Sequence, residues 1–210
     1  MSRDASGGQR LTRAAREQQI IESAAALVVE YGCLPLPLEA LGQQVGVSKA
    51  LIYAYFPTQQ DLAARILVAH LDIMGQSIEA AFRAGGGPRE VALRCAEAYF
   101  DHVCRHGRLI HLLLSDPMAA GVADPAVRRH YGRIMRRLSV SLRDGFDVPD
   151  ADCVAAVQIL AALAEDAGEQ VFTDRLDPEL GRALTRELTD GALCGLTERL
   201  RPPARSPAAS

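Results

Sequence analysis

The sequence predicts an all-α protein. Three observations support this: residues that favour helices (Ala, Leu, Arg and Glu) dominate the composition, apolar residues recur with helical spacing, and strand-type alternation is absent. With 49% hydrophobic and 23% charged residues, the 210-residue chain has a globular balance and enough length for a substantial core. We expect a polar arm at 1–10, an N-terminal unit at 11–60, a C-terminal helical unit at 61–200 and a disordered tail at 201–210.

The first helix is expected from about Leu11 to Tyr31, with Gly32 ending it. Arginines at its start, Arg13 among them, are candidates for phosphate contacts or for simple solvation. The apolar stripe expected to close over the following helices comprises Ile20, Ala24, Leu27 and Tyr31.

A helix-turn-helix is expected at about residues 37–56. Leu38, Leu41 and Val45 form the apolar stripe of a short helix, and Gly46 permits the positive φ of a sharp turn. Ser48 is a good N-cap for a second short helix that reaches about residue 54. Two short helices joined by a tight Gly-containing turn define the motif.

In such motifs the N-terminal residues of the second helix lie in the DNA major groove. Lys49 can donate to guanine or to phosphate, whereas Ala50 and Leu51 can contact only thymine methyl groups. Tyr53 and Tyr55 offer hydroxyl groups to phosphates. An ordinary helical hairpin with core aromatics is the alternative interpretation.

Pro57 stops the second helix, and Thr58 with Asp61 forms a capping-box-like start to the next one. A helix N-terminus is a natural phosphate site, and this one follows the groove-reading helix directly. The candidate DNA-binding residues are therefore Ser48, Lys49, Ala50, Leu51, Tyr53, Tyr55, Thr58 and Arg13.

The stretch from Val45 to Leu62 resembles the TetR family of one-component bacterial transcriptional regulators. The matching positions are Gly46, Val47, Ser48, Lys49, Ile52, Tyr53, Tyr55, Phe56, Pro57, Thr58, Asp61 and Leu62. The resemblance implies a small molecule that enters the C-terminal unit and shifts the helix after the motif. We expect a homodimer on a palindromic operator, because two-fold dimers match palindromic sites. A repressor is expected. The chain departs from the family pattern at Leu36–Leu38, at Leu51 and at Gln59, where a phosphate-contacting Lys is usual.

A long helix is expected from about Gln59 to Arg83, followed by a glycine break and a largely apolar helix from Pro88 to about His106. Asp116 with Pro117 and Asp124 with Pro125 are cap-then-Pro helix starts, and the second opens a helix to about Arg143. Its expected buried stripe comprises Val127, Tyr131, Ile134, Leu138 and Leu142. Its many arginines suit an acidic ligand or, more commonly, a solvated face.

Two further helices are expected, from about Ala151 to Phe172 and from Pro178, capped by Asp177, to Leu200. Small and apolar residues dominate both. They suit either the core of one chain or a dimer interface, and we expect the interface because one short recognition helix reads little DNA alone.

The central helices are expected to enclose a pocket with apolar walls, for which a lipophilic ligand is the default. The candidate lining residues are Ile78, Tyr99, Phe100, His102, Val103, His106, Leu112, Met118, Tyr131 and Met135.

Other functions compete with this prediction. Cys95, His102 and His106 share a helix face, so a metal- or redox-responsive regulator is one alternative. The set is incomplete, and we therefore expect no metal and no cofactor. Because no catalytic constellation can be assembled, an enzyme is not expected. An architectural DNA binder is disfavoured because the five basic and five acidic residues among the first 60 leave this part of the chain without net charge.

No signal peptide or apolar run of bilayer-spanning length is recognisable, so a cytoplasmic protein without a membrane partner is expected.

Overall fold

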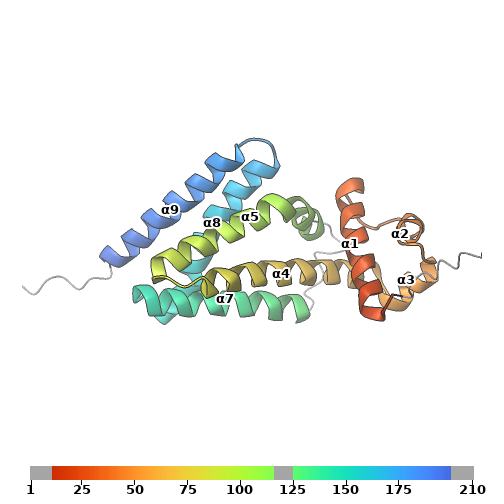
Figure 1. The fold of residues 1–210 in the computed structure, drawn as a ribbon, viewed down its shortest axis with the longest axis horizontal. Helices are drawn as coiled ribbons and strands as arrows, with labels where there is room; N and C mark the ends of the chain where they lie inside the picture. The colour runs from red at the N-terminus through yellow and green to blue at the C-terminus, as the bar shows by residue number, and fades with distance from the viewer. Residues whose placement is uncertain (1–10, 116–124, 200–210) are drawn as a thin grey trace, which may run out of the picture. The chain divides into compact units, whose positions relative to one another are not determined.

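The computed structural model describes residues 11–115 and 125–199, which form helices joined by short loops (Figure 1). The all-α prediction is confirmed. The helices are α1 (Arg13–Tyr31), α2 (Leu38–Val45), α3 (Lys49–Tyr55), α4 (Gln59–Arg83), α5 (Pro88–Ser115), α7 (Pro125–Phe146), α8 (Asp150–Phe172) and α9 (Pro178–Arg199). The arm at 1–10, the tail at 201–210 and the helix start at Asp116 lie outside the described residues.

The chain divides into two compact units. The N-terminal unit contains residues 11–66 together with Leu112–Ser115, and the C-terminal unit contains Leu67–His111 and the described residues from 125 onward. The division falls inside α4, a few residues beyond the boundary expected after residue 60. Leu62 and Ile66 are both buried and belong to the N-terminal unit.

Local capping signals fix the N-terminal helices. The hydroxyl of Thr12 accepts a hydrogen bond from the Ala15 amide at 3.2 Å, and α1 ends at Gly32 with φ 71°. α1 packs against α2 and α2 against α3. Ile20, Ala24 and Leu27 are buried as expected, whereas Tyr31, in the last turn of α1, is 49% exposed.

The turn between α2 and α3 depends on two glycines. Gly46 adopts φ 69° and ends α2, as the sequence predicts. Gly42 is required for another reason: a Cβ atom there would lie 2.6 Å from the carbonyl oxygen of Val47. The Val47 amide also donates to the Gly42 carbonyl at 2.8 Å, so the backbone of the turn is held directly against the helix.

We expect Gly42→Ala to destabilise the N-terminal unit by roughly 1–3 kcal/mol, because the added methyl group meets backbone that cannot rotate away. Gly132→Ala is the matched control. It lies in α7, where an added Cβ has no neighbour within 4 Å, and it should gain about 1 kcal/mol from helix propensity. Urea unfolding of both variants tests this, and equal stability would contradict a close approach at Gly42.

The C-terminal unit has two hydrophobic clusters. One joins α4, α5 and α7, and its buried members are Met74, Ile78, Ala81, Val91 and Cys95. The other joins α5, α7, α8 and α9, and its buried members are Leu93, Leu142, Phe146, Val148, Cys153, Val157 and Leu193. α8 packs against both α7 and α9. The space between the two clusters is where a cavity forms.

Two sequence expectations differ from the structure in this unit. α5 continues to Ser115 instead of ending near His106, because Leu109 and Leu113 extend its buried stripe beyond Gly107. Tyr131 of α7 is 46% exposed, although its stripe was expected to be buried. None of the helices in the described part of the chain is long and apolar enough to cross a membrane.

Candidate nucleic-acid interface and ligand cavity

The solvent-facing side of α3 carries both polar and apolar side chains, and buried residues on its other side fix it to the unit. The Ser48 hydroxyl accepts a hydrogen bond from the Leu51 amide at 3.2 Å and so caps the helix. Ile52 and Phe56 are buried and fix α3 to the unit. The remaining side chains expected to contact DNA are exposed on this helix: Lys49, Ala50, Leu51 and Tyr53.

Lys49 is held by a contact that the sequence did not reveal. Its Nζ atom lies 2.7 Å from Oε1 of Glu39 on α2, and both side chains are exposed. The hydrogen bond to Glu39 raises the pKa of Lys49, and the reciprocal bond lowers the pKa of Glu39. The lysine is therefore fully charged but oriented toward α2, and DNA must compete with Glu39 for it.

Tyr55 and Thr58 are already engaged within the unit. The guanidinium of Arg13 lies 5.6 Å from the centre of the half-buried Tyr55 ring, which brings the start of α1 to the end of α3. The Thr58 hydroxyl donates to Oδ2 of Asp61 at 2.7 Å and accepts from the Asp61 amide at 3.0 Å. The Thr58 amide completes the predicted capping box by donating to Asp61 at 2.9 Å.

Gln59, which stands where a phosphate-contacting lysine is usual in the family, has a structural role. Its amide group pairs with the Leu36 backbone, accepting from the amide at 2.6 Å and donating to the carbonyl at 2.8 Å. Arg16 likewise donates to the Val45 carbonyl at 3.1 Å, at the C-terminal end of α2. Both side chains therefore stabilise the helix-turn-helix through hydrogen bonds to backbone groups in it or next to it.

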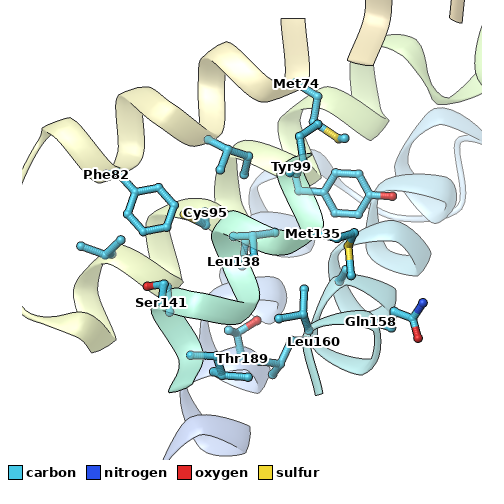
Figure 2. Close-up of a pocket in the computed structure, with 18 of the residues that line it drawn as sticks. Met74, Phe82, Cys95, Tyr99, Met135, Leu138, Ser141, Gln158, Leu160 and Thr189 are labelled. Carbon is cyan, nitrogen blue, oxygen red and sulfur yellow. The ribbon is translucent and has the colours of Figure 1, made fainter. Parts of the chain in front are cut away.

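A cavity of about 240 Å³ lies in the C-terminal unit, between α4, α5, α7, α8 and α9 (Figure 2). Its walls are mostly aliphatic and aromatic, and they include Met74 and Phe82 from α4 and Leu160 from α8. A few polar side chains reach the cavity, among them Ser141, Gln158 and Thr189. This combination is typical of a small-molecule site.

The structure brings together four of the ten residues expected to line a pocket: Ile78, Tyr99, Tyr131 and Met135. Phe100 and Val103 lie instead against α9 and α8, close to Gly181 and Gly168 respectively. His102 and His106 are not in the walls either. Leu112 belongs to the N-terminal unit, and Met118 lies outside the described residues.

Sequence reasoning missed the walls contributed by α8 and α9. Leu160, Glu165 and Thr189 lie far along the chain from α5, and nothing local marks the direction of their side chains. The one indication in the sequence was that both helices are rich in small residues. Small side chains leave space between a helix and its neighbours.

His102 and His106 face a third histidine, His70 of α4. Their ring centres lie 4.6 Å (His70 to His106), 4.9 Å (His102 to His106) and 6.1 Å (His70 to His102) apart. Burial and the neighbouring His106 lower the pKa of His70 to about 4, and burial first, then His106, His70 and Arg105, lowers the pKa of His102 to about 4. The cluster is therefore neutral at neutral pH.

These contacts give little support to the alternative of a metal- or redox-responsive regulator. Within residues 11–115 and 125–199, no three His, Cys, Asp or Glu side chains are placed to hold a metal ion. Burial raises the pKa of the Cys95 thiol to about 11, and burial likewise raises the pKa of Cys104. Both thiols stay protonated, a state unfavourable for oxidation.

The exposed, capped second helix of a helix-turn-helix on a helical C-terminal unit defines a DNA-binding regulatory protein. Residues 20–66 match the family model described as bacterial regulatory proteins, tetR family. Over these residues the chain has the DNA-binding domain of the TetR family of transcriptional regulators.

Several known regulators are similar to this chain in sequence or in fold. The transcriptional activator FasR of Mycolicibacterium smegmatis is 27% identical over 96 residues, a match spanning 46% of this chain and 44% of that protein. A transcriptional regulator from Pseudomonas aeruginosa PAO1 has a similar fold, with TM-score 0.72, 21% identity and coverage of 91% of this chain and 97% of that one. The TetR-like regulator LfrR from Mycobacterium smegmatis, solved with proflavine, has TM-score 0.60 and 17% identity, covering 89% and 98%.

Proposed function

We propose that the protein is a homodimeric, ligand-responsive regulator that leaves a palindromic operator when a small lipophilic molecule enters the cavity. The observation that carries the proposal is that one continuous helix, α4, serves both units. Its first turn holds the Thr58–Asp61 cap in the N-terminal unit, and its later residues Met74, Ile78 and Phe82 line the cavity. The family and the fold are those of regulators, and we propose no catalytic activity.

A ligand acts on DNA only if it prefers one conformation of the protein over another. Because α4 supplies cavity walls, a ligand that displaces those walls also changes the helix that begins beside the recognition helix. Repression is the simplest outcome of operator binding, although FasR, named as an activator, makes the opposite sign a real alternative. LfrR, which was solved with proflavine, supports a small-molecule site in this fold.

The test compares operator binding with and without a cavity ligand, in wild type and in Ala161→Phe. Ala161 is a half-buried cavity residue of α8, so the larger ring should occupy space that a ligand would take. We expect the variant to bind operator as wild type does but to resist release by the ligand. Normal release from the filled variant would show that the ligand acts elsewhere.

A second consequence concerns the dimer. Five large apolar side chains are exposed on α8 and α9: Val154, Ile159, Leu180, Leu184 and Leu188. Three of them repeat every fourth residue and therefore share one face of α9. An apolar surface of this kind marks an interaction site, and a second copy of the chain is the partner we propose.

We expect Leu184→Glu to weaken dimerisation by roughly 10- to 100-fold, because a charge would be buried without a partner. Ile73→Glu is the matched control, since Ile73 is similarly exposed but lies on α4. Light scattering across a dilution series measures the effect. A Leu184→Glu dimer as tight as wild type would place the interface away from this face of α9.

A further inference from the structure

Thr189 has a hydroxyl group without a partner at the cavity wall. The residue is 2% exposed, it lines the cavity, and its Oγ1 atom has no hydrogen-bond partner among the described residues (Figure 2). A buried hydroxyl that lacks a hydrogen bond is costly. A ligand group that forms a hydrogen bond with Thr189 therefore gains more binding free energy than one that meets a hydroxyl already hydrogen-bonded within the protein.

Thr185, one turn earlier on α9, shows how such a hydroxyl is normally satisfied. It is 1% exposed, and its hydroxyl donates to the Gly181 carbonyl at 2.9 Å. Thr189 makes no such bond with its own helix. The two threonines also differ in their surroundings: Thr189 lines the cavity, whereas Thr185 does not.

The charges around the cavity indicate what sort of polar group it accepts. Among the described lining residues Glu165 carries the only charge, and no Arg, Lys or His contributes to the walls. Burial, and then the charge of Glu165 and the neighbouring Tyr131, raise the pKa of Tyr99, so this phenol is neutral. The cavity therefore offers no counter-charge to an anion.

Arg137 and Arg94 are engaged with groups other than the cavity. Arg137 lies over the Phe82 ring, 4.1 Å from its centre, and pairs with Glu79 at 3.6 Å. Arg94 donates to the Ala81 carbonyl at 3.3 Å and also to the Gly85 carbonyl. Neither guanidinium is available to a carboxylate inside the cavity without losing these partners.

We propose that the cavity takes an uncharged lipophilic molecule with a hydroxyl or carbonyl group that pairs with Thr189, and that it discriminates against carboxylates of the same size. This inference rests on the proposed function for the role of the cavity as a ligand site. It goes further by assigning the polarity and the charge of the ligand, and by naming the side chain that recognises it.

The experiment uses three probes with one apolar body and different head groups: decanol, decanoate and decylammonium. Their binding to the full chain is measured by calorimetry. We expect decanol to bind most tightly and decanoate at least about tenfold more weakly, since an anion would be desolvated beside Glu165 without a partner. Thr189→Val should lower the affinity for decanol by about fivefold, the effect of one hydrogen bond. The control variant Thr185→Val should leave the affinity for decanol unchanged.

A second variant tests the charge. Glu165→Gln should recover part of the affinity for decanoate relative to decanol. Decanoate binding as tightly as decanol to the wild type would overturn the inference. So would unchanged decanol affinity in Thr189→Val, or decylammonium as the tightest ligand, because Glu165 would then be the anchor.

The possible outcomes distinguish this inference from the proposed function on which it rests. If no probe binds, the cavity is not a ligand site and both proposals fail. If decanoate binds best and releases operator DNA, only the assigned ligand class is wrong. If decanol binds in the expected order but operator binding is unchanged, the class stands and the proposed coupling to DNA fails.

Discussion

Replacing both Lys49 and Tyr53 with Ala is expected to weaken operator binding by roughly 1000-fold. Each residue is exposed on α3, and each offers one polar group to a base edge or a phosphate. Loss of about 1 kcal/mol per contact, in each of two protomers, sums to about 4 kcal/mol. Fluorescence anisotropy with a labelled operator duplex measures the change. A variant that binds within about threefold of wild type would remove α3 from the interface.

Two further variants sharpen this result. Glu39→Gln releases Lys49 from its ion pair and removes a carboxylate near the DNA-facing helix, so operator affinity should rise and its salt dependence should steepen. Tyr31→Ala is the matched control for Tyr53→Ala, because Tyr31 is also an exposed tyrosine of the N-terminal unit but lies at the end of α1. It should leave DNA binding intact.

The protein is expected to lose stability as the pH falls from above about 6.5 to about 4, through its histidine cluster. In the unfolded chain a histidine binds its proton near pH 6.5, whereas burial holds the pKa of His102 at about 4 in the folded state. Between these two pH values the unfolded state therefore binds more protons than the folded state, and the free energy of unfolding decreases as the pH is lowered. For His102, which is 4% exposed, the loss is about 2 kcal/mol between about pH 7.5 and pH 5.

His102→Phe tests the origin of this effect because phenylalanine keeps a ring against His70 and His106 but cannot bind a proton. The difference in unfolding free energy between about pH 7.5 and pH 5 should shrink by about 2 kcal/mol. His111→Phe, at an exposed position of the same helix, should leave the difference unchanged. A pH dependence unaffected by His102→Phe would show that His102 is not its source.

The N-terminal unit could be predicted closely because its signals are local. The turn at Gly46, the cap at Ser48 and the Thr58–Asp61 pair each act within a few residues, and all have the expected geometry. Side-chain partners from different helices could not be predicted in the same way. Glu39 is ten residues from Lys49, and only the packing of α2 against α3 brings the two together.

The cavity was harder to predict because α5 is apolar around most of its circumference. Tyr99 and Phe100 are neighbours in sequence, yet one lines the cavity and the other packs against α9. Nothing in the periodicity of α5 alone decides which side faces the open space. The histidine cluster was incomplete for the same reason, since His70 comes from α4 and only the packing of two helices reveals it.

The most direct test of the proposed function is selection of bound duplexes from a random-sequence DNA library by the full chain, followed by sequencing. A homodimer reading DNA through two copies of α3 should enrich a two-fold-symmetric consensus, with half-sites spaced by about one helical turn or a multiple of it. The Lys49→Ala, Tyr53→Ala variant should enrich none. Enrichment of an asymmetric site, or of no sequence at all by the folded wild-type protein at low salt, would contradict the account.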